Sequence, residues 1–114
     1  MNSIPGWTKE FPSAITVCDK EGIIIYMNDK SCKTFKKDGG NKLIGKSLFD
    51  CHPENVLSKL KEMITQRIPN SYTIEKNGVR KHIHQSPWFE NGEYKGFVEL
   101  SIEIPLEMPN FIRV

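Results

Sequence analysis

Two apolar runs near the start of the chain predict a β-hairpin. Residues 14–19 and 23–28 are rich in β-branched side chains, and Lys20-Glu21-Gly22 separates them with a short turn sequence. Such runs, joined by a turn that contains glycine, are typical of paired antiparallel strands. Ahead of them, three apolar residues at helical spacing predict one short helical turn or a docking arm. They are Ile4, Trp7 and Phe11.

The middle of the chain shows helical spacing. Asn28 or Asp29 is a favourable N-cap for a short helix that continues to Phe35, and residues 43–49 predict another helical turn. A longer helix begins at Pro53, because proline is well tolerated at a first helical position. Its apolar residues recur every three or four positions, as on the buried stripe of an amphipathic helix. They are Val56, Leu57, Leu60, Met63 and Ile64.

Three further strands follow this helix. Asn77-Gly78 is a strong hairpin signal between strands at 71–76 and 79–89, and a second turn at 90–93 precedes a last strand at 94–104. Apolar and polar residues alternate strictly along that last strand, which predicts that its apolar side faces the core. The apolar positions are Val98, Leu100, Ile102 and Ile104, and the polar ones are Glu99, Ser101 and Glu103.

Two strands, several helices and three strands predict an α+β fold. We expect an antiparallel sheet of about five strands, with short helices and one longer helix packed on one face. The length of 114 residues suits one domain. We expect an N-terminal arm over residues 1–11, the domain over 12–105 and a C-terminal tail over 106–114. Pro105 and Pro109 prevent a continuous helix after the last strand, and together with Met1 they favour a complete small protein over a fragment.

Composition excludes several classes of protein. The net charge of +2 is too small to indicate nucleic-acid binding, and there is neither a signal peptide nor an apolar run long enough for a membrane span. Cys18, Cys32 and Cys51 are odd in number and widely spaced, which fits reduced thiols in a cytosol. We therefore expect a cytoplasmic protein that binds neither nucleic acid nor membrane.

Several short motifs, in this order and spacing, resemble the PAS domain family from about Phe11 to Ile104. Residues 12–28 are similar to the opening hairpin of the family and the asparagine cap of its next helix. Leu43-Ile44-Gly45-Lys46 is similar to the segment before the long helix, and Ser86-Pro87-Trp88 with Asn91-Gly92 and Gly96-Phe97-Val98 resembles the last hairpin. Asp50-Cys51-His52-Pro53 also resembles a subgroup of bacterial and archaeal PAS domains with Cys-His-Pro before the long helix.

The resemblance implies a profilin-like sheet cupped around short helices, often with a ligand pocket between them. It implies a sensory module, not an enzyme, that binds a small ligand or a partner protein and signals through protein–protein interaction. The fold does not decide which ligand is bound. We expect apolar residues of the strands and helices to line the pocket. They are Ile15, Val17, Ile25, Phe35, Leu48, Leu60, Ile64, Val98 and Leu100.

Haem remains an open cofactor, whereas flavin is not favoured. Haem sensors of this family mostly bind iron through a histidine on the long helix, and residues 53–67 contain none. His52 stands just before that helix and, with Cys51, is the candidate haem or metal ligand. Alternatively, His52 caps the helix and Cys51 fills an apolar niche. Leu48 occupies the place where the flavin photosensors of the family carry a reactive cysteine.

Other functions remain as alternatives. One is a ligand-free interaction module, a homodimer through Trp7, Phe11 and the face that bears Glu99, Ser101 and Glu103. A haem-binding redox or gas sensor is a second. A small α+β enzyme is a third, and it predicts that Asp50, Cys51 and His52 converge in a cleft. No nucleophile elbow or phosphate-binding loop supports the enzyme.

His82 and His84 lie two residues apart on one expected strand, so their side chains share a face. With a third ligand they could bind a divalent metal, and as titratable groups they could make an interface sensitive to pH. No third ligand is evident, which favours a polar, aromatic face exposed to solvent or to a partner.

Overall fold

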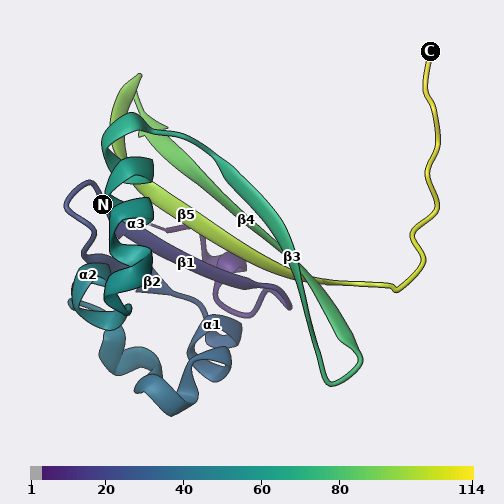
Figure 1. The fold of residues 1–114 in the computed structure, drawn as a ribbon, viewed down its shortest axis with the longest axis horizontal. Coiled ribbons are helices and arrows are strands. Elements are labelled where there is room, and N and C mark those ends of the chain that lie inside the picture. The colour runs from purple at the N-terminus through teal and green to yellow at the C-terminus, as the bar shows by residue number, and fades with distance from the viewer. Residues whose placement is uncertain (1–3) are drawn as a thin grey trace.

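Five antiparallel strands form one sheet in the spatial order β2-β1-β5-β4-β3. The computed structural model describes residues 4–114, apart from the side chain of Cys51. The strands are β1 (Ala14–Asp19), β2 (Ile24–Met27), β3 (Asn70–Lys76), β4 (Val79–Glu90) and β5 (Glu93–Ile104). The α-helices lie against one side of this sheet (Figure 1), which we call the inner face. The α+β fold expected from the sequence is confirmed.

The helical segments are short except for one. The α-helices are α1 (Asp29–Thr34), α2 (Leu48–Cys51) and α3 (Glu54–Gln66), and the 3₁₀ helices are η1 (Gly6–Thr8), η2 (Lys36–Asp38) and η3 (Gly40–Leu43). Asn28 caps α1 by accepting a hydrogen bond from the backbone N–H of Ser31. Pro53 is the N-cap of α3, so this helix begins one residue later than expected, and left-handed Arg67 ends it. The helical turn expected over residues 43–49 does not span that range. The 3₁₀ helix η3 ends at Leu43, helix α2 begins at Leu48, and the residues between them are not helical.

A β-bulge near the start of β5 decides which residues of that strand face the helices. Phe89 pairs with Tyr94, whereas Trp88 pairs with Gly96, so Lys95 is one extra residue on β5. Successive side chains point to opposite faces, and one extra residue therefore reverses the alternation. As a result Tyr94 and Phe97, three positions apart, pack in the same core cluster with other buried residues. The other members of that cluster are Cys18 and Met63.

The bulge corrects the expectation for the last strand. Glu99 and Ser101 share a face with Phe97 and with their partners on β1, Thr16 and Ala14, and this is the inner face. The alternating apolar residues point to the opposite side, which we call the outer face. There they are only partly covered, and the exposed fraction of Ile102 reaches 37%. The apolar residues that lie on the outer face, and not on the inner face as expected, are Val98, Leu100, Ile102 and Ile104.

The N-terminal segment crosses the outer face, behind the sheet in Figure 1. Thr8 shares a hydrogen bond of 2.8 Å with the hydroxyl of Tyr26, which pairs with Val17 and lies on its side of the sheet. At the other end of the chain, residues after Ile104 extend away from the sheet (Figure 1). Within residues 4–114, no helix is long and apolar enough to cross a membrane.

Candidate ligand-binding cavity

A cavity of about 200 Å³ lies between the inner face and the helical segments. Most of its lining is apolar, and the most deeply buried lining residues come from β1, β2, α3 and β5. We call it the inner cavity. Its lining residues are Thr16, Cys18, Ile24, Met27, Phe35, Asp38, Leu43, Leu48, His52, Leu60, Met63, Ile64, Gln85, Phe97, Val98 and Glu99.

The pocket residues expected from the sequence divide into two groups. Phe35, Leu48, Leu60 and Ile64 line the inner cavity. Val98 also lines it, although the side chain of Val98 points to the outer face. Four residues that were expected in the pocket do not line the inner cavity, and the expectation is corrected for them. They are Ile15, Val17, Ile25 and Leu100.

The correction follows from strand alternation. Ile15 and Val17 alternate with the lining residues Thr16 and Cys18, so they point to the outer face, although both are buried there. Leu100 pairs with Ile15 and lies on the same side. Ile25 falls at the register shift of the β1–β2 pair, where an extra residue interrupts the alternation of β2.

A row of polar side chains crosses the inner face beside the apolar lining. Asn70, Gln85, Glu99 and Thr16 are successive partners on β3, β4, β5 and β1. Asn70 Nδ2 donates to Gln85 Oε1 at 3.1 Å, and Gln85 Nε2 donates to Glu99 Oε1 at 2.8 Å. Thr16 Oγ1 shares a hydrogen bond of 2.5 Å with Ser31 Oγ at the start of α1. This polar row supplies hydrogen-bonding groups to an otherwise apolar site, the usual design of a small-molecule pocket.

The charged groups of the cavity lining are of one sign. Asp38 and Glu99 contribute carboxylates, and none of the lining residues that the structure describes is lysine or arginine. Asp38 and His52 are exposed and lie where the cavity opens to solvent, whereas Glu99 is half-buried. An anion entering this space would meet two carboxylates and no fixed positive charge.

His52 lines the inner cavity, and its ring is already held in place. His52 Nδ1 lies 2.8 Å from the carbonyl oxygen of Leu48, so Nε2 is the ring atom left for another partner. The side chain of Cys51 lies outside the described residues, and Asp50 is exposed and does not line the cavity. Among the described side chains, no group of three or more His, Cys, Asp or Glu is placed to hold a metal ion.

Haem does not fit the cavity in this conformation. A cavity of about 150 Å³ holds one benzene ring, and the inner cavity measures about 200 Å³. A porphyrin is several times larger than such a ring, and its two propionates would meet Asp38 and Glu99 without an opposing cation. The residues present therefore favour a smaller ligand.

Cys18 places a thiol in the cavity wall. Burial raises the pKa of this thiol from its ordinary value of 9.0 to about 11. At neutral pH the group is therefore a neutral thiol, a weak donor and a small apolar surface, and not a thiolate nucleophile.

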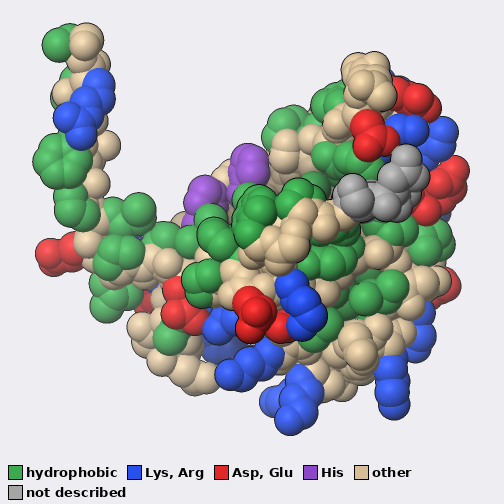
Figure 2. Space-filling view, turned by 180° about the vertical axis from the view of Figure 1, so that it is seen from behind, with side chains coloured by type: hydrophobic (Ala, Val, Ile, Leu, Met, Phe, Trp, Pro, Cys, Tyr) green, Lys and Arg blue, Asp and Glu red, His purple; other side chains and the backbone are tan. Residues whose placement is uncertain are grey.

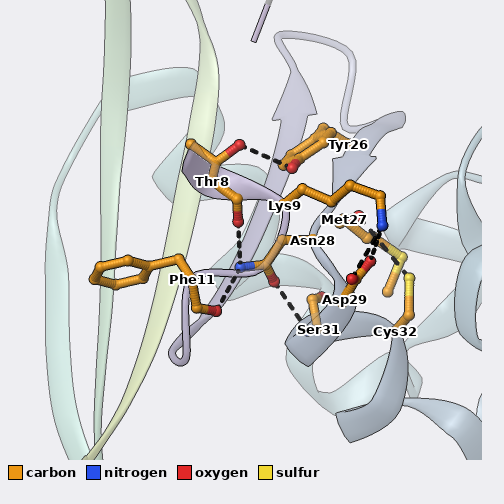
Figure 3. Close-up of polar contacts among 9 residues, drawn as sticks. All are labelled: Thr8, Lys9, Phe11, Tyr26, Met27, Asn28, Asp29, Ser31 and Cys32. Atoms are coloured by element: carbon orange, nitrogen blue, oxygen red, sulfur yellow. Dashed lines mark hydrogen bonds and ion pairs between the residues drawn. The ribbon is translucent and has the colours of Figure 1, made fainter. Parts of the chain in front are cut away.

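The amide of Asn28 joins three segments of the chain, and Asn28 is 1% exposed. Figure 3 shows its bonds to two of them, the N-terminal segment and the start of α1. Asn28 Oδ1 accepts hydrogen bonds from the backbone N–H groups of Ile15 and Ser31, at 2.9 and 3.0 Å. Asn28 Nδ2 donates to the carbonyl oxygens of Thr8 and Ser13, at 3.0 and 2.9 Å. The start of α1, strand β1 and the N-terminal segment are therefore held by one side chain.

The residues expected to form an interface lie on two different faces. Trp7 and Phe11 belong to the N-terminal segment, are 65% and 42% exposed, and contact each other edge to face at 5.4 Å between ring centroids. Glu99 and Ser101 lie on the inner face, and Glu99 lines the cavity. The expectation of a single interface through all four residues is therefore corrected. A contact through Trp7 and Phe11 stays a prediction.

His82 and His84 lie on the outer face, with ring centroids 6.0 Å apart. His82 Nε2 shares a hydrogen bond of 2.5 Å with Ser71 Oγ on β3. Figure 2 views this side of the molecule and shows histidine beside hydrophobic side chains. Their shared face agrees with the expectation from their spacing.

Sequence reasoning missed the polar row. If the pairing of β4 with β5 continued from the Asn91-Gly92 turn without a bulge, Gln85 would pair with Val98 and not with Glu99. One signal was available, namely the apolar spacing of Tyr94 and Phe97, which is three and not two. That spacing is inconsistent with an uninterrupted strand if both residues are core residues.

Comparisons with known proteins agree with this architecture. The sequence model of a family described as PAS domain matches residues 12–104. No curated protein matches the sequence. Among solved structures, a C-terminal domain from Streptococcus mutans is similar with a TM-score of 0.70 and 21% identity, over 85% of this chain and 79% of that one.

Two further structures are similar to this chain. The Aer2 receptor from Vibrio cholerae, described as a dual PAS-heme oxygen sensor, has a TM-score of 0.64 and 19% identity, over 82% of this chain and 95% of that one. The PAS domain of BvgS from Bordetella pertussis has a TM-score of 0.60 and 24% identity, over 87% of this chain and 82% of that one. At these identities the likeness concerns the fold.

Proposed function

The chain belongs to the PAS domain family of sensory modules, and on that premise we propose that it senses a small molecule in its inner cavity and signals to a protein partner without catalysing a reaction. The observation that carries the proposal is the cavity itself. Its apolar lining with a few converging polar groups is what a small ligand requires.

A chain of hydrogen bonds supports a route from the cavity to the surface. Thr16 lines the cavity and bonds to Ser31, whose backbone N–H is bonded to Asn28. Asn28 in turn holds the carbonyl oxygens of Thr8 and, at 3.4 Å, Phe11. A ligand that shifts Thr16 or α1 would therefore change how the N-terminal segment is held, and with it the exposed aromatic pair. Such coupling requires that the ligand bind the two arrangements with different affinity.

The partner is a second copy of the chain or another protein, and the exposed pair of Trp7 and Phe11 is the surface proposed for it. Exposed aromatic residues that lie together are typical of protein interfaces. The same observation favours a second candidate function, a ligand-free dimerisation module. The two functions differ in one respect, because only the sensor changes its N-terminal segment when the cavity is filled.

Toluene is a suitable first probe, because it matches the size and apolar character of the cavity. In ¹⁵N-labelled protein we expect toluene to shift the backbone signals of β1, the side-chain amide of Asn28 and the indole signal of Trp7. Leu60→Trp, which fills the cavity, should abolish these shifts. Leu57→Trp is the matched control, since Leu57 lies on the same helix and is not a lining residue.

The outcomes separate the two functions. Shifts at β1 that extend to Asn28 and Trp7 support the sensor. Shifts confined to the cavity would overturn the proposed route to the surface, and the absence of any cavity shift would overturn ligand sensing and leave the interaction module.

A further inference from the structure

The inner cavity has a polarity that restricts the chemical class of its ligand. The chain contains 16 Lys and Arg residues, yet none of them is among the lining residues that the structure describes. The charged groups that do line it are Asp38 at the opening and Glu99 on the sheet. Like charges in a space partly removed from water repel strongly. The cavity wall therefore disfavours carboxylates, phosphates and other anions.

Glu99 lies on β5, the central strand of the sheet, and one of its two carboxylate oxygens is free to accept a hydrogen bond from a ligand. Its Oε1 accepts the hydrogen bond from Gln85, whose own oxygen is occupied by Asn70. Within residues 4–114 as described, Glu99 Oε2 has no hydrogen-bond partner in the protein, and Glu99 lines the cavity. An ionised carboxylate only accepts hydrogen bonds. A ligand that contacts Oε2 must therefore supply the donor.

The volume restricts the ligand as well. A cavity of about 150 Å³ binds benzene, so about 200 Å³ leaves room for one ring with one or two further heavy atoms. The ring would lie against buried apolar side chains of the wall, where its transfer from water is favourable. Those side chains include Ile24, Met27 and Phe97.

From these features, and resting on the proposed sensory function, we infer that the inner cavity takes a compact apolar molecule, about the size of a substituted benzene ring, that directs an N–H or O–H donor at Glu99 and carries no negative charge. The donor replaces the water that would otherwise solvate Oε2. Gln85 on β4 holds the Glu99 side chain through its hydrogen bond of 2.8 Å, so the acceptor is positioned before the ligand arrives.

Four probes of nearly equal size test this inference on the full chain. They are benzylamine, benzyl alcohol, toluene and benzoate, titrated at pH 7 into ¹⁵N-labelled protein. We expect the amine and the alcohol to bind more tightly than toluene, by about tenfold for the amine because a charge-assisted hydrogen bond is stronger than a neutral one. Benzoate should bind more weakly than toluene.

Glu99→Gln tests the role of the carboxylate directly. The variant retains an oxygen for Gln85 and places an NH₂ group, itself a donor, where the free oxygen was. The advantage of the amine over toluene should disappear, and toluene affinity should not change. Glu103→Gln is the matched control, because Glu103 lies four residues along the same strand and face and does not line the cavity.

Each result decides the matter. An amine or alcohol advantage that is lost in Glu99→Gln and kept in Glu103→Gln supports the inference. Toluene binding as tightly as both donors, benzoate binding more tightly than toluene, or an advantage that survives in Glu99→Gln overturns it while leaving the sensory function intact. If none of the four probes binds, the sensory function fails first and the inference fails with it. Circular dichroism of each variant verifies that the fold is retained.

Discussion

The indole N–H of Trp88 on β4 donates a hydrogen bond of 3.2 Å to the carbonyl oxygen of Cys18 on β1, although β5 lies between these two strands. The bond passes over Gly96, which pairs with Trp88 on one side and with Asp19 on the other. A Cβ atom on Gly96 would lie 2.0 Å from the Cys18 oxygen. The absence of a side chain at residue 96 is therefore what allows the bond to form.

Gly96→Ala should destabilise the fold severely. The new methyl group would collide with backbone atoms of β1 that cannot rotate away, and Gly96 has a φ of +150° that other residues rarely adopt. We expect a loss of at least about 3 kcal/mol in the free energy of unfolding, measured by urea denaturation. Gly78→Ala is the control, since Gly78 also has a positive φ but no atom within 4 Å of a Cβ, and it should cost only about 1 kcal/mol. Equal losses for the two variants would contradict the steric explanation.

Asn28→Ala should release the N-terminal segment from the sheet. Without the amide, the buried N–H groups of Ile15 and Ser31 and the carbonyl oxygens of Thr8 and Ser13 lose their partner. We expect a loss of about 3 kcal/mol or more by thermal or urea denaturation, because buried unpaired polar groups are costly. Hydrogen exchange should increase at the start of β1 and of α1. Asn41→Ala, at an exposed position, is the control that should change neither quantity.

Cys18 should make the fold less stable at alkaline pH. Burial raises the pKa of the folded thiol from 9.0 to about 11, so between these values the unfolded chain ionises first. The contribution of Cys18 to stability is therefore complete below pH 9 and is lost as the pH rises through 11, by on the order of 2 kcal/mol. Urea denaturation at pH 8 and pH 10.5 measures this loss. The difference between wild type and Cys18→Ala should become smaller at the higher pH, and a constant difference would argue against the raised pKa.

Added haem should not form a complex that depends on His52. The inner cavity, at about 200 Å³, is smaller than a porphyrin requires, and its carboxylates oppose the propionates. We expect the absorption spectrum of protein mixed with haem to be the same for wild type and His52→Ala. A Soret band that shifts or disappears in the variant would show instead that α3 moves to admit haem and that His52 binds the iron.

Trp7 and Phe11 should govern self-association. Replacing both by serine removes the exposed aromatic surface, and neither residue belongs to the buried core. We expect the wild-type mass in light scattering to exceed that of one chain at high concentration and the double variant to be monomeric. Ile44→Ser, which removes an apolar group that is 43% exposed in the loop before α2, is the control and should leave the mass unchanged. A wild-type chain that stays monomeric would refute the interface.

The candidate site could be predicted from the sequence only in part. The positions of Leu60 and Ile64 in the lining could be predicted, because helical spacing identifies the apolar face of the helix and that face packs against the sheet. The residues that β5 contributes to the cavity could not be predicted from the sequence. The alternation of Val98 and Leu100 with Glu99 defines two faces of the strand, but it does not show which face is the inner one. The apolar side was therefore assigned to the cavity, where the structure places Glu99.

The sequence by itself determined the hairpin turns at Asn77 and Asn91 and the cap at Asn28, since each depends on residues close together in the chain. The order and spacing of the motifs along the chain determined the order of the elements and the membership of the family. The tertiary structure decided the placement of the extra residue Lys95 on β5, and thereby every side-chain direction beyond it. A bulge costs little locally and is selected by packing across the whole sheet. That packing brought Thr16, Gln85 and Glu99 into one row beside the cavity, although they lie far apart in the sequence.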